Sequence, residues 1–288
     1  MKNLGGAIAF VLLTIISISC GRPLPTDNVL RREGRYNQSF VSTSGFVINE
    51  DILGRPKLFA TCFLADKFDE RGMAVFLTAN HFFRESGAGY RDTIKLFFNG
   101  RVYKPVSIVL PDPLSDIAVL VISDFPVEQS LEPLGLGEKP KAGDAVYLDG
   151  FHNHGVNILT ESDTLRIYRD YYGYSSARDE VVHEILSAKV DGLDVSMRIG
   201  SDPLSYLYNY TRFIADNHDN MFLGFSGSPL IDKSGHVVGV ISRQRTDNSP
   251  ADLFAVDWGG LVSIMQYVGK LFNESNFVEK DLIGEYMR

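Results

Sequence analysis

Apolar residues in this chain of 288 residues come in short runs that are rich in β-branched and aromatic side chains. From position 40 onward, Gly, Asp, Asn or Pro separate the runs about every ten positions, which is typical of strands joined by turns. The runs are FVSTSGFVIN, KLFATCFLA, MAVFLTA, TIKLFF, RVYKPVSIVL, IAVLVI and AVYLDGF, then, after a looser region over 152–220, SPLID, HVVGVIS and LFAVDW. This spacing predicts an all-β fold of antiparallel strands, arranged as a sandwich or barrel.

The final apolar stretch has a different period. In GGLVSIMQYVGKLF the apolar residues recur at intervals of three and four, so they share one face of a helix that follows Gly259 and Gly260. The residues of that face are Leu261, Ile264, Met265, Val268, Leu271 and Phe272. A segment with Gly and Pro over 134–143 is the predicted linker between two halves of six strands each. The sequence therefore predicts two β-halves followed by one C-terminal helix.

The N-terminus has the pattern of a targeting signal. Lys2 precedes an apolar run over 7–16, small residues follow as far as Cys20, and polar sequence comes next. The run is too short for a membrane span, so 1–19 is predicted to be a signal peptide. The segment Ser-Ile-Ser-Cys resembles the lipobox of bacterial lipoproteins, which implies a lipid on Cys20; simple secretion is the alternative. In either case the protein is expected outside the cytoplasm, with 20–38 as a polar tether.

Charge and cysteine content argue against several classes of function. The formal net charge is −8 and no basic run occurs, so nothing in the sequence would attract nucleic acid. The same charge argues against adsorption to anionic lipid, which leaves a lipid anchor as the expected membrane contact. Cys62 lies among apolar residues and is predicted to be a buried thiol rather than a nucleophile. His152 and His154 have no third ligand nearby, so neither a metal nor another cofactor is expected.

The segment GFSGSP at 224–229 has the composition of a tight turn that exposes a serine. Gly224 and Gly227 allow a sharp turn around Ser226, which would present both its hydroxyl and backbone N–H groups. A nucleophilic hydroxyl needs donors for the oxyanion that develops, and the N–H groups of Gly224 and Ser226 are the candidate oxyanion hole. Pro229 ends the turn, and the two apolar runs after it would form a hairpin that supports the loop.

Two other segments supply the remaining parts of a nucleophilic site. His81 follows the apolar run in FLTANHF, and Asp116 immediately precedes the apolar run in DPLSDIAVLVI. An aspartate at the start of so apolar a strand is either a cap or a partly buried acceptor for an imidazole N–H. Nucleophilic catalysis needs a base within reach of the serine and a group that orients the base, and these two residues are the candidates.

The segments LTANH, SDIAVL and GFSGSPL, in that order along the chain, resemble the histidine, aspartate and serine motifs of chymotrypsin-fold, trypsin-like serine proteases. The order distinguishes this family from α/β-hydrolases and subtilisins, in which the three residues follow other orders. The resemblance implies that Ser226 is the nucleophile, that His81 acts as general base and then acid, and that Asp116 orients His81.

For the fold, the resemblance implies two six-stranded antiparallel β-barrels with a C-terminal helix, within a protease domain over 39–288. The first barrel would cover about 39–135, and the second barrel with the helix about 143–275. For the activity, it implies a serine endopeptidase that cleaves polypeptide substrates through an acyl-enzyme without a cofactor. The alternatives are an esterase-like hydrolase with the same triad and an inactive binding module on a protease scaffold.

The resemblance places the primary specificity pocket beside the serine motif and the last hairpin strand. The residues that it implies for substrate binding are Asn220, Met221, Ile241, Ser242 and Arg243. Asn220 stands where trypsin has an aspartate, so a preference for basic side chains is disfavoured and an uncharged side chain is favoured. Phe225 stands where many family members carry an aspartate that binds a freed amino terminus, so packing of Phe225 is expected to order the loop instead.

Overall fold

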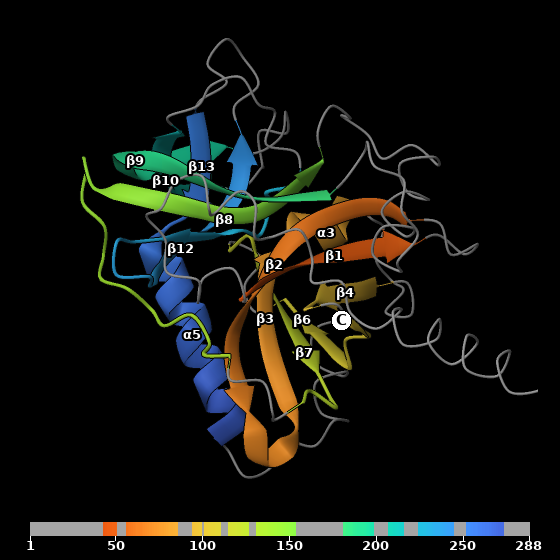
Figure 1. Cartoon of the computed structure of the whole chain (residues 1–288). Coiled ribbons are helices and arrows are strands. Elements are labelled where there is room, and N and C mark those ends of the chain that lie inside the picture. Colours follow the sequence, from red (N-terminus) through yellow and green to blue (C-terminus); the bar gives the residue numbers. More distant parts are fainter. Residues whose placement is uncertain are drawn as a thin grey trace, which may run out of the picture.

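The computed structural model describes residues 43–50, 56–85, 94–99, 101–110, 115–126, 131–153, 181–198, 207–215, 224–244 and 252–273. Within them the chain forms two antiparallel sheets and one long helix (Figure 1). The predicted signal peptide and tether, with Cys20, and the residues Asn220 and Met221 lie outside the described residues, so what the sequence predicts for them stays a prediction. In the described ranges, no helix is long and apolar enough to cross a membrane.

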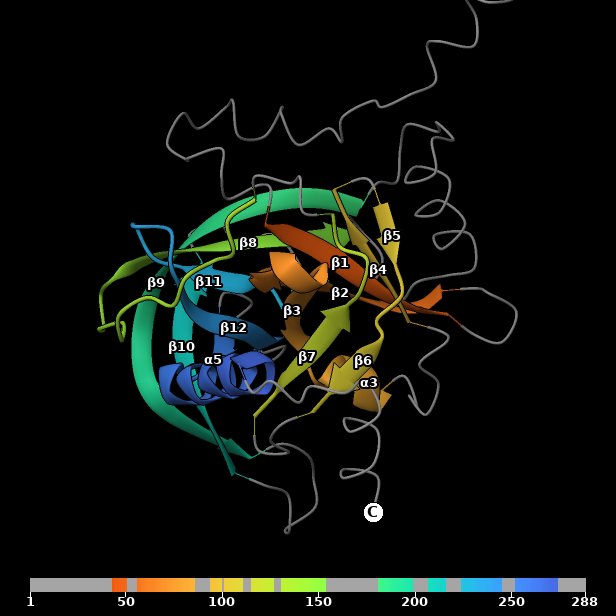
Figure 2. The ribbon, with the colours of Figure 1, turned by 90° about the horizontal axis from the view of Figure 1, so that it is seen from below.

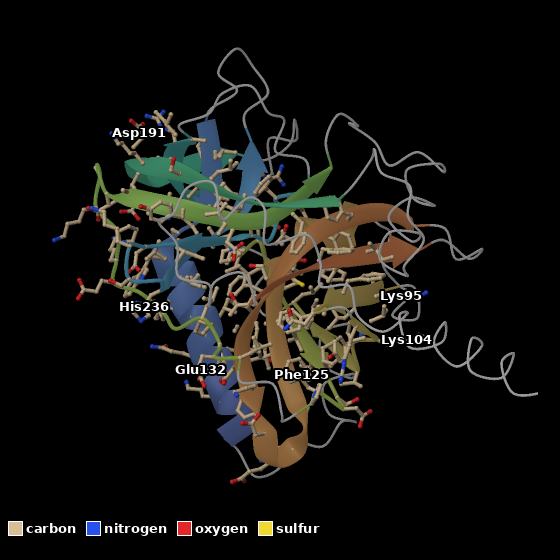
Figure 3. The ribbon with its side chains drawn as sticks, viewed as in Figure 1. Lys95, Lys104, Phe125, Glu132, Asp191 and His236 are labelled. Atoms are coloured by element: carbon tan, nitrogen blue, oxygen red, sulfur yellow. The ribbon has the colours of Figure 1, made fainter. Side chains whose placement is uncertain are left out.

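The first sheet contains seven strands in the order β5-β4-β1-β2-β3-β7-β6, and every neighbouring pair is antiparallel. The strands are β1 (Ser44–Glu50), β2 (Pro56–Phe68), β3 (Met73–Ala79), β4 (Ile94–Phe98), β5 (Arg101–Tyr103), β6 (Ser107–Val109) and β7 (Ile117–Ile122). The short helices η2 (Asp69–Arg71) and α3 (His81–Glu85) precede and follow β3. Phe125, labelled in Figure 3, contributes to an aromatic core on this sheet with Phe76, Phe98 and Tyr103.

This half has seven strands where the sequence predicts six. The run RVYKPVSIVL, expected to form one strand, forms β5 and β6, which lie at opposite edges of the sheet. Pro105 between them has no backbone N–H for a ladder hydrogen bond, so the strand is interrupted there. Among the described residues β5 and β6 do not pair with each other, and the sheet curls into a half-barrel (Figure 2).

The second sheet is a closed barrel of six antiparallel strands, as predicted, in the order β10-β13-β12-β11-β8-β9. Its strands are β8 (Ala145–Asn153), β9 (Val181–Arg198), β10 (Leu207–Ala215), β11 (Pro229–Ile231), β12 (Val237–Gln244) and β13 (Asp252–Val256). The all-β, chymotrypsin-like fold with a C-terminal helix is therefore confirmed.

Strands β9 and β10 lie in the region 152–220, where the sequence predicts no strand. β9 pairs with β8 on one side and with β10 on the other. Its side chains point alternately into the barrel and toward solvent. Leu186, Ala188 and Val190 are buried in the barrel core, and Lys189 is exposed. The segment VDGLD within β9 contains turn-forming residue types, and strand pairing on both sides overrides that local preference.

The helix α5 (Trp258–Asn273) confirms the helical period seen in the sequence. Leu261, Ile264 and Val268 are buried in a core that also contains Leu77 of β3 and Val240 of β12. Figure 1 shows α5 extending from the second barrel along the side of the first sheet. The apolar face of the helix therefore packs against both halves of the molecule.

Candidate active site

The pairing of β3 with β7 brings His81 and Asp116 together. The two strands pair Ala79 with Ile117, so His81, just after β3, and Asp116, just before β7, lie at the same end of the ladder. The N–H of Asn80 donates to Asp116 O at 3.1 Å, and the N–H of His81 donates to Asp116 Oδ1 at 2.7 Å. Strand pairing and the hydrogen bond from the His81 N–H therefore hold the carboxylate beside the histidine.

Ser226 approaches this pair from the second half of the molecule, in the loop before β11. His81 Nδ1 lies 2.7 Å from Asp116 Oδ2, and His81 Nε2 lies 3.0 Å from Ser226 Oγ. The structure thus brings together the three residues that the separate motifs single out, in a continuous hydrogen-bonded chain between the two sheets.

Asp116 is a buried carboxylate that accepts several hydrogen bonds. It is 5% exposed, and in addition to the two N–H groups of His81, the hydroxyl of Ser242 donates to Oδ2. Burial raises the pKa of this carboxyl, but the hydrogen bond and charge of His81, with the Ser242 hydrogen bond, outweigh burial and hold the pKa below its ordinary value. The ionised Asp116 accepts a hydrogen bond from the Nδ1–H of His81, which keeps the proton on Nδ1 and leaves the Nε2 lone pair facing Ser226 Oγ.

The serine loop requires glycine at two positions. Gly224 and Gly227 have φ angles of 98° and 87°, in the left-handed region that other residues rarely adopt. A Cβ at Gly227 would lie 2.1 Å from Thr61 O, so the loop packs too closely against β2 for any side chain there. Phe225, which the sequence predicts to order the loop by packing, is 1% exposed and lies in the core of the second barrel.

The N–H groups of Gly224 and Ser226 are available in this loop. Within the part of the chain that the structure describes, no hydrogen bond of the fold uses either N–H. The carbonyl groups of the same two residues both accept the N–H of Thr61, at 3.0 and 2.9 Å. Sequence reasoning missed Thr61, because it lies 163 positions from Gly224 and no local pattern signals the contact.

The structure gives different surroundings to the three described residues that the sequence predicts to bind substrate. Ile241 is 2% exposed with its side chain in the core of the second barrel, and its N–H donates to Ser228 O at 2.9 Å. It therefore supports the serine loop from β12. Ser242 points its hydroxyl at Asp116, and Arg243 is half-buried.

Tyr210 in β10 is a neighbour of the site that the sequence did not indicate. It is 1% exposed, and its hydroxyl interacts with the Ser242 side chain and with the charges of Asp116 and Arg243. Burial, the largest effect, and the charge of Asp116 raise the pKa of this hydroxyl, whereas Ser242 and Arg243 lower it. The net result is a pKa above the ordinary value. Tyr210 is therefore a neutral phenol at neutral pH, and it lies in a strand that no sequence pattern predicted.

Cys62 of β2 is 0% exposed, and burial raises the pKa of its thiol against the opposing effect of a backbone hydrogen bond from Gly45. An enclosed, protonated thiol is a poor nucleophile, in line with the structural role that the sequence indicates.

A half-barrel that carries histidine and aspartate, joined to a closed barrel that carries serine, defines the class of chymotrypsin-like peptidases. The chain belongs to the family of the trypsin-like peptidase domain, whose sequence model matches residues 43–240. The family predicted from the three motifs is therefore confirmed. No curated protein matches the chain.

Crystal structures of the Rv3671c protease from M. tuberculosis are similar to this chain. The active form has a TM-score of 0.54 and 17% identity, covering 86% of this chain and 88% of that chain. An inactive form has a TM-score of 0.53 and 16% identity, covering 86% and 98% of the two chains. A serine-to-alanine mutant in the inactive form has a TM-score of 0.51 and 18% identity, covering 87% and 96%. At this identity the likeness shows a shared fold.

Proposed function

We propose that this protein is a serine endopeptidase that acts outside the cytoplasm and hydrolyses polypeptides through an acyl-enzyme. The observation that carries the proposal is the chain of hydrogen bonds from Asp116 through His81 to Ser226, with distances of 2.7 and 3.0 Å. Membership of the trypsin-like peptidase family supports a peptide bond as the target. The extracytoplasmic location rests on the N-terminal sequence.

The first half of the reaction forms the acyl-enzyme. His81 Nε2 takes the proton from Ser226 Oγ as that oxygen attacks the carbonyl carbon of the substrate, and the ionised Asp116 stabilises the imidazolium that results. The carbonyl oxygen becomes negatively charged, and the N–H groups of Gly224 and Ser226 donate to it. His81 then gives its proton to the leaving amine, the peptide bond breaks, and the acyl group stays on Ser226.

The second half releases the acyl group. Water attacks the ester carbonyl while His81 Nε2 takes a proton from it, the same backbone N–H groups stabilise the second oxyanion, and the proton returns to Ser226 Oγ as the product acid departs. The same residues therefore serve both halves, and water is the only further reactant in the second.

Labelling with a fluorophosphonate tests the proposal directly, because this probe reacts covalently with an activated serine hydroxyl. The wild-type protein should label at Ser226, and Ser226→Ala should not label. Ser228→Ala is the matched control: its hydroxyl is buried with no hydrogen-bond partner among the described residues, so its loss should leave labelling unchanged.

A wild-type protein that does not label at neutral pH would favour the inactive binding module. A labelled protein that cleaves an activated ester but no peptide, in a screen of peptides with varied side chains, would favour the esterase-like hydrolase.

Activity is expected to be lost as the pH is lowered, because a protonated His81 cannot accept the Ser226 proton. The pKa of Asp116 affects the stability of the fold at acid pH. Its lowered pKa contributes stability that is fully present above about pH 4, the ordinary value, and is lost only as pH falls through the lower folded value. Hydrolysis rates and near-UV circular dichroism, measured on the same samples, should show activity lost at a higher pH than the fold. A rate that stays constant as the pH is lowered until the fold is lost would contradict His81 as the base.

A further inference from the structure

Thr61 of β2 connects three parts of the molecule from one fully buried position. Its N–H donates to Gly224 O and Ser226 O, and its Oγ1 donates to Gly224 O at 2.8 Å. The same Oγ1 accepts the N–H of Phe151 in β8 at 2.9 Å. The carbonyl of Thr61 in turn accepts the hydroxyl of Thr78 in β3 at 2.6 Å. Thr61 is therefore hydrogen-bonded to its own sheet, to the serine loop and to the second barrel.

These contacts fix the peptide units beside the two candidate oxyanion donors. The carbonyl of Gly224 belongs to the peptide unit that lies, along the chain, between the N–H of Gly224 and the N–H of Ser226. Because a peptide unit is planar, holding its carbonyl also holds its orientation. Gly224 has a φ of 98° and the wide conformational freedom of glycine, so bonds from outside the loop are needed to keep the donors pointing one way.

The hydroxyl is the part of this arrangement that depends on the residue type at position 61. Most residues would supply the backbone N–H, but Thr adds a second donor to Gly224 O and an acceptor for the N–H of Phe151. The distances of 2.8 and 2.9 Å are those of well-formed hydrogen bonds. The hydroxyl is buried, so its loss would remove both of these hydrogen bonds from the interior of the protein.

We propose that the hydroxyl of Thr61 is a positioning group for the oxyanion hole, which holds the N–H groups of Gly224 and Ser226 toward the carbonyl oxygen of the substrate. The inference rests on the proposed serine peptidase function. It also accounts for how the loop is held when Phe225 cannot bind a freed amino terminus, because the bonds come from the neighbouring sheet of the same chain. Thr61 touches no reacting atom and acts through the loop.

Three variants separate this role from a general effect on stability. Thr61→Val keeps the shape of the side chain and the backbone N–H but removes the hydroxyl. Thr61→Ser restores the hydroxyl without the methyl group. Ser44→Ala is the matched control, because it removes another buried hydrogen bond between the two halves, from Ser44 Oγ to Asp149 Oδ2 at 2.8 Å, that does not involve the serine loop.

For each variant, the melting temperature, the fluorophosphonate labelling rate, kcat and KM for a peptide substrate, and the affinity for a peptide boronate should be measured. The boronate forms a tetrahedral adduct on serine and so reports on the oxyanion hole. We expect Thr61→Val to lower kcat and the labelling rate by about 10- to 100-fold, somewhat less than the loss of one oxyanion donor, with KM nearly unchanged. Boronate affinity should fall by the same factor as kcat/KM, Thr61→Ser should recover most of the activity, and Ser44→Ala should retain it.

Several results would overturn the inference. One is a folded Thr61→Val protein with the kcat and boronate affinity of the wild type. Another is a loss of activity that Ser44→Ala reproduces in proportion to its melting temperature, because that result would assign Thr61 to stability alone. A Thr61→Ser protein as slow as Thr61→Val would also contradict a role for the hydroxyl. A wild-type protein that does not react with fluorophosphonate would instead overturn the proposed function, and this inference with it.

Discussion

Replacing Ser226 with alanine is expected to lower kcat for peptide hydrolysis by about 10⁴-fold or more while the protein stays folded. Ser226 Oγ lies 3.0 Å from His81 Nε2 and 3.5 Å from Ser242 O, so the hydroxyl has little part in holding the fold. Its loss should change the free energy of unfolding by less than about 1 kcal/mol. In contrast, among the described residues no other hydroxyl is hydrogen-bonded to His81 Nε2, so the covalent route is closed.

The experiment compares kcat for one peptide substrate in the wild type, Ser226→Ala and Ser228→Ala, with melting temperatures for all three. Ser228 lies in the same loop, and its N–H donates to Phe225 O at 2.8 Å, but its hydroxyl is buried and lies beside Gly150 of β8. Only Ser226→Ala should lose activity. Rates for Ser226→Ala within tenfold of the wild type would remove Ser226 as the nucleophile, and equal losses in both variants would indicate damage to the loop rather than to the chemistry.

The three motif residues could be predicted from the sequence because each one lies in a short segment with its own local signal. The glycines around Ser226, the strand before His81 and the strand after Asp116 are all visible within ten positions, and the order of the motifs implies the fold that joins them. The helix could be predicted for the same reason, since its period is a local property.

The supporting residues could not be predicted because their roles depend on contacts between distant segments. Thr61 is an ordinary β-branched residue in a strand until the fold places Gly224 against it, and Tyr210 lies in a strand with no clear pattern of its own. Pro105 divides a run that otherwise has the composition of one strand. In each case the outcome is decided by which strands become neighbours, and single-sequence patterns carry little information on that.

Replacing Asp116 with asparagine is expected to lower kcat at neutral pH by about 10⁴-fold, through the protonation pattern of the histidine rather than through its position. Asp116 Oδ1 accepts the backbone N–H of His81, and Oδ2 accepts His81 Nδ1 and the Ser242 hydroxyl. A backbone N–H can only donate, so the amide oxygen of the variant must take the place of Oδ1. The amide NH₂ then faces His81 Nδ1, and Nδ1 becomes an acceptor.

The proton of the neutral imidazole is then on Nε2, where it points at Ser226 Oγ. In this tautomer the free lone pair is on Nδ1, so Nε2 cannot take the serine proton, although all three side chains keep their places. The loss of the carboxylate charge adds to the effect, because the imidazolium that forms during the reaction is no longer stabilised. The variant should therefore bind substrate with a KM close to that of the wild type but turn it over far more slowly.

Asp149→Asn is the matched control for this change, because Asp149 is also a fully buried carboxylate and accepts the Ser44 hydroxyl at 2.8 Å, away from the histidine. Both variants replace a buried carboxyl group with an amide and both are expected to lower the melting temperature, but only Asp116→Asn should lose kcat among molecules that remain folded. NMR of the imidazole nitrogens, with ¹⁵N-labelled histidine, should show the proton on Nδ1 in the wild type and on Nε2 in Asp116→Asn. Full activity in Asp116→Asn, or a slow variant whose His81 keeps its proton on Nδ1, would contradict the role of Asp116 as the residue that sets the tautomer.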